Sequence, residues 1–285
     1  MNITIARIGA HPTVAFAQAE LSRYLLKMDK KLFIDERVYD EYCADVKSAI
    51  WIGLDGTLPL TNDSDEILID IKGGCGRITA SNEKALLIAV YRLLFELGCR
   101  FLFPGEDGEV IPTAILDENT LTVSVSDKAS YRHRGMCIEG AVCYSHIYDM
   151  IDWLPKVGMN GYFMQFRTPA EFFKRFHNDN ENPLMSPSPV TDEDVTRMWA
   201  RLEEEIARRS LDYHAVGHGW TCEPFGIVGT GWNVYDGEID ESITYWHSST
   251  IIANTSRTIF MQCYHNFITM TIGHFVNTII YYFPK

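Results

Sequence analysis

Short apolar runs alternate with amphipathic helical segments along most of this 285-residue chain. Residues 3–8 and 49–54 have the composition of buried strands, and the segment between them begins a helical stripe of apolar residues directly after a proline. Residues 66–72 and 76–80 predict two further strands in a hairpin, because the glycines between them can adopt the positive φ angles of a tight turn. This order predicts a mixed α/β fold.

The pattern divides the chain into three segments. Residues 1–127 form the predicted N-terminal α/β domain, in which Ser81 or Asn82 caps a strongly apolar helix. Residues 128–241 change to a strand–helix–strand order, with predicted strands at 134–140, 161–167 and 211–217. Because successive β-α units follow a separate domain, we expect these strands to be the first part of a (β/α)8 barrel.

Two helices connect the predicted strands of the second segment. Ser145 is predicted to cap the first helix, and Thr191 with Asp194 forms a capping-box pattern before the second. The second helix contains the charged run RLEEEIARR, whose Glu and Arg residues have helical spacing. This run predicts a solvent-exposed helix face.

The last segment, residues 242–285, departs from this pattern. It contains no acidic residue, and its only basic residues are Arg257 and Lys285. A membrane helix is one explanation, but amide and imidazole side chains make 258–284 too polar for a comfortable span. A second explanation is an atypical closing segment, and a third is a truncated or frame-disrupted chain. A barrel usually takes about 250 residues, which 131–285 does not supply, so we expect an incomplete barrel.

The composition restricts the partners, the cofactors and the compartment. A net charge of −13 argues against nucleic acid, which needs a basic face. The seven cysteines include no CxxC, and the N-terminus has no signal-peptide pattern, so we expect free thiols and a cytoplasmic protein. The run GIVGTG lacks the strand-to-helix context of a dinucleotide site, and we expect no cofactor and no membrane partner. A small carbohydrate is compatible with this composition.

Two stretches resemble a known group of enzymes. The stretch RITASNEKALLIAVYRLLFELGCRFLFPGEDGEVIP is similar to the end of the α/β domain that precedes the catalytic barrel in family 20 β-hexosaminidases and in α-glucuronidases. The stretch YRHRGMCIEG resembles the strand that opens their barrel. The resemblance covers roughly residues 1–235 and is closest to bacterial proteins described as glycosidases. It implies a glycoside hydrolase in which an N-terminal α/β domain precedes a TIM-type barrel.

The resemblance also implies roles for single residues. Arg134 matches the first-strand arginine that binds sugar hydroxyls in hexosaminidases, and Glu139 matches an acid that follows in that strand. His218 lies in a Val-Gly-His context similar to the family's Pro-Gly-His. The family's catalytic Asp-Glu pair follows two glycines, whereas Asp240-Glu241 follows Glu238-Ile239. The catalytic carboxylates are therefore unassigned.

Residues in or near the predicted strands are candidates for catalytic or substrate-binding roles. Arg134 presents parallel donors that fit two vicinal hydroxyls, and the alternative is an arginine that bridges the two domains to an acid. Glu139 and Arg167 end their strands, at the barrel face where catalysis gathers. Glu139 is thus a candidate catalytic residue and Arg167 a candidate substrate-binding residue, and the alternative for both is an ordinary loop contact. His133 is interpreted as a surface residue.

The stretch LDYHAVGHGWTCEPFG holds the remaining candidates. His214 and His218 are candidate substrate-binding residues, with a structural role as the alternative. A zinc site would need further ligands such as Cys222 or Glu223, and we expect no metal. Trp220 suits stacking on a sugar ring, although a buried loop anchor has the same pattern. Glu223 is the second candidate catalytic carboxylate.

The sequence therefore favours a glycoside hydrolase that acts on an oligosaccharide or glycoside, inactive if the chain is truncated. The alternative is a non-catalytic carbohydrate-binding or structural remnant of such an enzyme. A metalloenzyme built on His214 and His218 is a third, weaker hypothesis. The sequence does not predict the sugar, the linkage, the stereochemistry or the oligomeric state.

Overall fold

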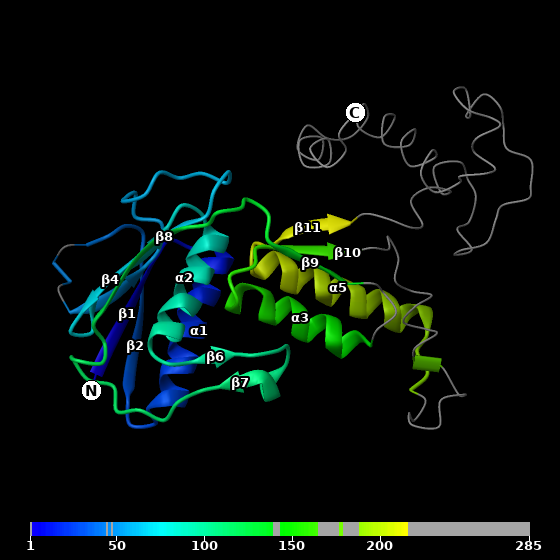
Figure 1. Cartoon of the computed structure of the whole chain (residues 1–285), viewed down its shortest axis with the longest axis horizontal. Helices are drawn as coiled ribbons and strands as arrows, with labels where there is room; N and C mark the ends of the chain where they lie inside the picture. The colour runs from blue at the N-terminus through cyan, green and yellow to red at the C-terminus, as the bar shows by residue number, and fades with distance from the viewer. Residues whose placement is uncertain are drawn as a thin grey trace, which may run out of the picture. The chain divides into compact units, whose positions relative to one another are not determined.

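The computed structural model describes residues 2–43, 45–46, 48–138, 143–164, 177–178 and 188–215 (Figure 1). Described residues within 1–163 and 170–214 pack into one compact unit. Within these ranges, no helix combines the length and the apolar character needed to cross a membrane. The predicted division near residue 127 stays a prediction.

A six-stranded mixed sheet forms the N-terminal part of this unit. Its strands are β1 (Asn2–Ile8), β2 (Phe33–Tyr39), β3 (Ala49–Ile52), β4 (Glu66–Lys72), β5 (Cys75–Ala80) and β8 (Val123–Lys128). They lie in the order β2-β1-β3-β5-β4-β8. β1 pairs in parallel with β2 and β3, and β3 pairs in parallel with β5. β4 is antiparallel to both β5 and β8.

The β4–β5 hairpin is confirmed, and glycines determine its geometry. Gly73 and Gly74 in the turn have φ angles of +61° and +77°. Gly76, with φ of +146°, begins the return strand, and a Cβ there would lie 2.0 Å from the carbonyl oxygen of Asp70. Any side chain at Gly76 would therefore force the two backbones apart.

Two helices cover one face of this sheet (Figure 1). α1 (Pro12–Met28) and α2 (Glu83–Glu96) pack on each other and bury Leu21, Leu25 and Val90 against isoleucines of the sheet. Each such side chain contributes about 1.5–3 kcal/mol by leaving water. Asn82 caps α2, because its side-chain oxygen accepts from the backbone N–H of Ala85 at 2.9 Å. A short hairpin of β6 (Arg100–Phe101), η1 (Glu106–Gly108) and β7 (Glu109–Val110) follows α2.

The second part consists of the predicted β-α units. β9 (Gly135–Ile138), β10 (Gly161–Met164) and β11 (Asp212–Ala215) form a separate sheet with β10 in the centre. α3 (Tyr144–Lys156) lies between β9 and β10 in the chain, and α5 (Asp192–Arg208) lies between β10 and β11. The fold class is therefore the predicted one: a small mixed α/β part is followed by the first β-α units of a barrel.

Two predictions about these helices were wrong. α3 begins at Tyr144 with Cys143 at the N-cap, and no side chain caps it, so Ser145 lies inside the helix. The charged run of α5 is not wholly solvent-exposed, because Arg209 is only 2% exposed and Glu205 is 8% exposed. Arg209 instead pairs with Asp152 of α3 and with Glu205. The capping box of Thr191 and Asp194 is confirmed.

Candidate functional site

His214 lies on the face of the β9–β11 sheet opposite to the one that packs against α5. Side chains alternate along a strand, so Tyr213 and His214 occupy opposite faces of β11. Tyr213 packs against Trp199 of α5, with ring centroids 6.3 Å apart. His214 packs against Phe163 at 6.5 Å and meets His133 edge-on at 5.7 Å. In a barrel, this face is the interior.

Two glycines keep the backbone beside His214 bare. A Cβ at Gly161 would lie 3.7 Å from Nε2 of His214, and a Cβ at Gly135 would lie 2.9 Å from the carbonyl oxygen of Gly161. Neighbouring strands therefore approach closely at Gly135. The result is a bare stretch of backbone next to an imidazole and a phenyl ring.

Asp212 and Lys84 set the electrostatics of this face. Nζ of Lys84 donates to both carboxylate oxygens of Asp212 at 2.8 Å, and the Lys84 side chain is only 8% exposed. Nδ1 of His133 lies 3.9 Å from the same carboxylate. Burial lowers the pKa of His214. His133 and Lys84 lower this pKa further, whereas the Asp212 carboxylate raises it. Burial also lowers the pKa of His133, and Asp212 again acts in the opposite direction by raising it.

Both imidazoles are therefore mainly neutral at pH 7. A neutral imidazole has one N–H donor and one acceptor nitrogen, and a hydroxyl group can bond to either. The face around His214 thus offers the donor, the acceptor and the ring surface that a sugar contact needs.

We expect His133 and His214 to titrate below pH 6.5, the ordinary histidine value. Asp212→Asn removes a group that raises both pKa values and leaves Lys84 unopposed, so both should fall further. Lys84→Met should raise both, since it removes a positive charge. NMR titration of the imidazole Cε1 protons measures these shifts. Shifts of the same sign in the two variants would contradict this electrostatic account.

Arg134 lies immediately before β9, and each of its three side-chain nitrogens makes a hydrogen bond. Nε donates to the carbonyl of Gly158 at 2.8 Å, and one terminal nitrogen donates to the carbonyl of Tyr131 at 2.7 Å. The other donates to the carboxylate of Asp65 at 2.6 Å. These contacts favour the interpretation of Arg134 as a bridge to an acid of the α/β part. Sugar binding by Arg134 stays a prediction that none of these contacts supports.

The other candidates lie outside the described residues, namely Glu139, Arg167, His218, Trp220 and Glu223. Among the residues that the structure describes, no group of three or more His, Cys, Asp or Glu side chains is arranged to hold a metal ion. Sequence reasoning missed His133, Gly135, Gly161 and Phe163 as neighbours of His214. One available signal was the glycine that begins both β9 and β10.

Comparison with known proteins gives structural likeness alone. No protein-family model matches the chain. No curated protein matches it either. The chain is similar to the GH20 β-N-acetylhexosaminidase from Streptomyces coelicolor A3(2), at 12% identity and a TM-score of 0.50, over 74% of this chain and 41% of that one. It is also similar to a GH138 enzyme targeting pectin rhamnogalacturonan II, at 14% identity and a TM-score of 0.50, over 88% of this chain and 37% of that one.

The two similar structures establish the kind of fold. Both are glycoside hydrolases with TIM-barrel folds. The chain spans about two fifths of the length of each. The chain therefore has a glycoside-hydrolase-like fold.

Proposed function

We propose that this chain acts as a glycoside hydrolase on an oligosaccharide or glycoside, with the substrate at the carboxyl ends of β9, β10 and β11. One observation carries the proposal. The three strands are neighbours in one sheet and are separated in the chain by helices, as in successive β-α units. In such units the carboxyl ends of the strands share one edge, where TIM-barrel enzymes place their catalytic residues.

Candidate residues follow each of these strands in the sequence. β9 ends at Ile138, directly before Glu139. Arg167 comes three residues after the end of β10, and His218 comes three residues after the end of β11. A glycosidase needs a polar edge of this kind, with carboxylates to transfer protons or attack the sugar.

We assign proposed roles on this basis. Glu139 and Glu223 are the carboxylates that act as acid, base or nucleophile. Arg167 and His218 bind hydroxyls, and Trp220 stacks on a sugar ring. His214 extends this surface along the inner face of β11, where its neutral imidazole accepts or donates a hydrogen bond.

A non-catalytic carbohydrate-binding protein is the second candidate function. The observation that favours it is the lack of an Asp-Glu pair behind two glycines, the catalytic pattern of the family that the sequence resembles. The same edge would then hold a sugar without cleaving it.

Assay of a panel of aryl glycosides, combined with oligosaccharide binding by saturation-transfer NMR, tests the proposal. We expect hydrolysis, with kcat/KM lowered by about 10²–10⁴ in Glu139→Gln or Glu223→Gln. Glu118→Gln, a change on an exposed loop, is the matched control and should leave the rate unchanged. Binding without hydrolysis would establish the second candidate. Absence of both would overturn the proposal.

A further inference from the structure

A groove of about 630 Å³ lies between α2 and the turn that follows α3. Ile88, Tyr91, Arg92 and Phe95 form one wall, and their spacing places them on a single stripe of α2. Residues 155–158 line the groove opposite this stripe. Its volume is in the range of small-molecule sites.

The groove is separate from the proposed catalytic edge. Its lining residues Ala129 and Arg134 precede β9, and Val157 and Gly158 precede β10. The groove therefore lies by the amino ends of these strands, whereas the proposed catalytic edge lies at their carboxyl ends. A ligand in the groove would not occupy that edge.

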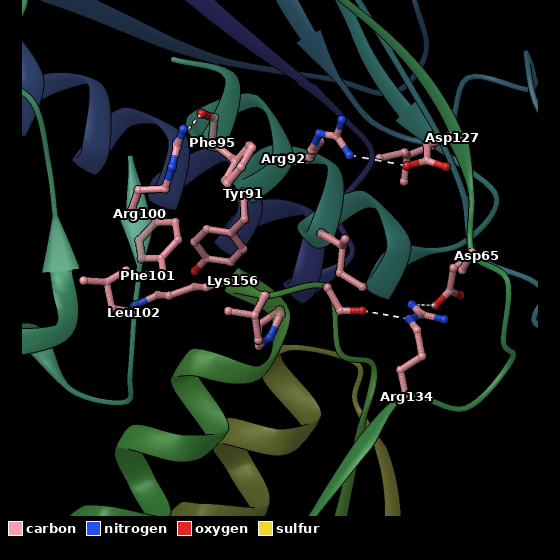
Figure 2. A pocket seen from close by; sticks show the side chains of 16 residues that line it. Asp65, Tyr91, Arg92, Phe95, Arg100, Phe101, Leu102, Asp127, Arg134 and Lys156 are labelled. Carbon is pink, nitrogen blue, oxygen red and sulfur yellow. Dashed lines mark hydrogen bonds and ion pairs between the residues drawn. The ribbon is translucent and has the colours of Figure 1, made fainter. Parts of the chain in front are cut away.

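Most charged groups in the groove are paired with each other or with close neighbours. Arg134 pairs with Asp65 at 2.6 Å, and Arg92 pairs with Asp127 at 3.3 Å (Figure 2). Nζ of Lys156 lies 2.8 Å from a carboxylate oxygen of Glu109, and the Lys156 side chain is 4% exposed. These groups already have ion-pair partners within the chain.

Arg100 is the exception at one end of the groove. One of its terminal nitrogens donates to the carbonyls of Phe95 and Cys99, at 2.8 and 2.7 Å. Its guanidinium carbon lies 3.9 Å from the centroid of the Phe95 ring (Figure 2). Within the described part of the chain, no ion pair joins Arg100 to a carboxylate. Arg100 therefore contributes an uncompensated positive charge.

The guanidinium of Arg100 is also well shaped for a carboxylate. Contact with the Phe95 ring and two carbonyls restrains its plane. The remaining N–H groups form a fork of parallel donors, the geometry that binds both oxygens of a carboxylate. This charge stands out in a chain whose net charge is −13.

Apart from Arg100 and the Arg92–Asp127 pair, the exposed lining of the groove is largely apolar. Phe95 is 45% exposed, Leu102 is 64% exposed and Val157 is 39% exposed. Phe101 and Pro155 extend this apolar surface. Such a surface favours a ligand whose body is a ring or an alkyl chain, since burial of apolar area drives its binding.

We propose that this groove binds a small carboxylate with an apolar body. The carboxylate pairs with Arg100, and the apolar body lies against Phe95, Leu102 and Val157.

Isothermal titration calorimetry of the full chain with 4-phenylbutyrate tests this site, with 4-phenyl-1-butanol as the uncharged analogue. We expect the acid to bind at least about tenfold more tightly than the alcohol, because a charge-assisted bidentate pair is lost in the alcohol. Arg100→Gln should weaken binding of the acid by a similar factor. Leu102→Ser should weaken binding of both ligands, by about threefold or more.

Arg37→Gln is the matched control, because Arg37 is a half-exposed arginine on β2 that pairs with Asp35. It should bind the acid as the unaltered chain does. Arg100 and Leu102 are exposed, so thermal melts should show that their variants fold. The proposal is overturned if the acid does not bind, if acid and alcohol bind equally, or if Arg100→Gln binds the acid unchanged. Glycoside hydrolysis should be unaffected by Arg100→Gln, so this site and the proposed function can fail separately.

Discussion

Replacing Arg209 with methionine is expected to lower the free energy of unfolding by about 3–5 kcal/mol. Arg209 is 2% exposed and lies 2.5 Å from a carboxylate oxygen of Asp152. It also pairs with Glu205 and lies 4.7 Å from the ring centroid of Phe16 in α1. Methionine keeps much of the packing but removes one of the two cations that each carboxylate has, so Asp152 keeps Lys156 and Glu205 keeps Arg208. Breaking a buried pair from one side is costly because the remaining charge stays desolvated.

The network of ion pairs extends beyond Arg209. Asp152 also pairs with Lys156, and Lys156 pairs with Glu109. The ammonium group of Lys156 lies 5.5–5.9 Å from three ring centroids, those of Tyr24, Tyr91 and Phe101. The charges therefore connect α3 and α5 with the α/β part. Because these residues share partners, removal of one disturbs the rest.

Urea denaturation followed by circular dichroism measures this change. Arg197→Met is the matched control, because Arg197 lies on α5, the helix whose C-cap is Arg209, and pairs with Asp194, but its side chain is 71% exposed. Exposed pairs contribute little, so we expect a change below about 1 kcal/mol in the control. Equal losses in the two variants would show that the buried network adds no stability.

The sequence predicted the elements whose side chains follow a simple period. β1, β3 and the β4–β5 hairpin consist of apolar runs or glycine turns, and α2 has an apolar stripe. β2 was missed because its sequence, FIDERVY, is rich in charge and its side chains are largely exposed at the edge of the sheet. Charged residues at i, i+4 spacing look the same whether exposed or buried, which is why Arg209 was misplaced.

The candidate site was predicted one residue at a time, without the contacts between strands. His214 was placed on a strand correctly, but its neighbours His133 and Phe163 come from other parts of the chain. Their proximity depends on the register of the strands, which no local pattern contains. Two interpretations of Arg134 stayed open because its partner, Asp65, is 69 residues away in the sequence.

Replacing Asp65 with asparagine is expected to cost about 2–4 kcal/mol near neutral pH. The Asp65 side chain is 4% exposed and accepts from Arg134 at 2.6 Å, from Asn160 at 2.7 Å and from Asn82 at 3.0 Å. It therefore connects the start of β4, the N-cap of α2 and the start of β9. Asparagine removes the negative charge that pairs with Arg134. Its amide N–H group would also face the N–H groups that donate to Asp65, where an acceptor is required.

Because the Asp65 carboxylate titrates, the stability lost in Asp65→Asn is expected to depend on pH. Burial raises the pKa of Asp65, but hydrogen bonds from Asn82, Arg134 and Asn160 outweigh burial and hold that pKa below its ordinary value. The unfolded chain therefore binds a proton at Asp65 more readily than the folded chain does. The stabilisation is fully present above the unfolded value of about 4, and it is lost as pH falls through the lower folded value.

Unfolding free energies of both proteins between pH 3 and pH 7 test this dependence. The difference between the unaltered chain and Asp65→Asn should be largest at pH 5–7 and should shrink below about pH 4, because asparagine does not titrate. Asp152 and Glu109 also have lowered pKa values despite burial, and both groups remain in Asp65→Asn. The variant should therefore still lose stability in acid, but less steeply than the unaltered chain. A difference that stays constant down to pH 3 would show that the charge of Asp65 does not stabilise the fold and that only its shape matters.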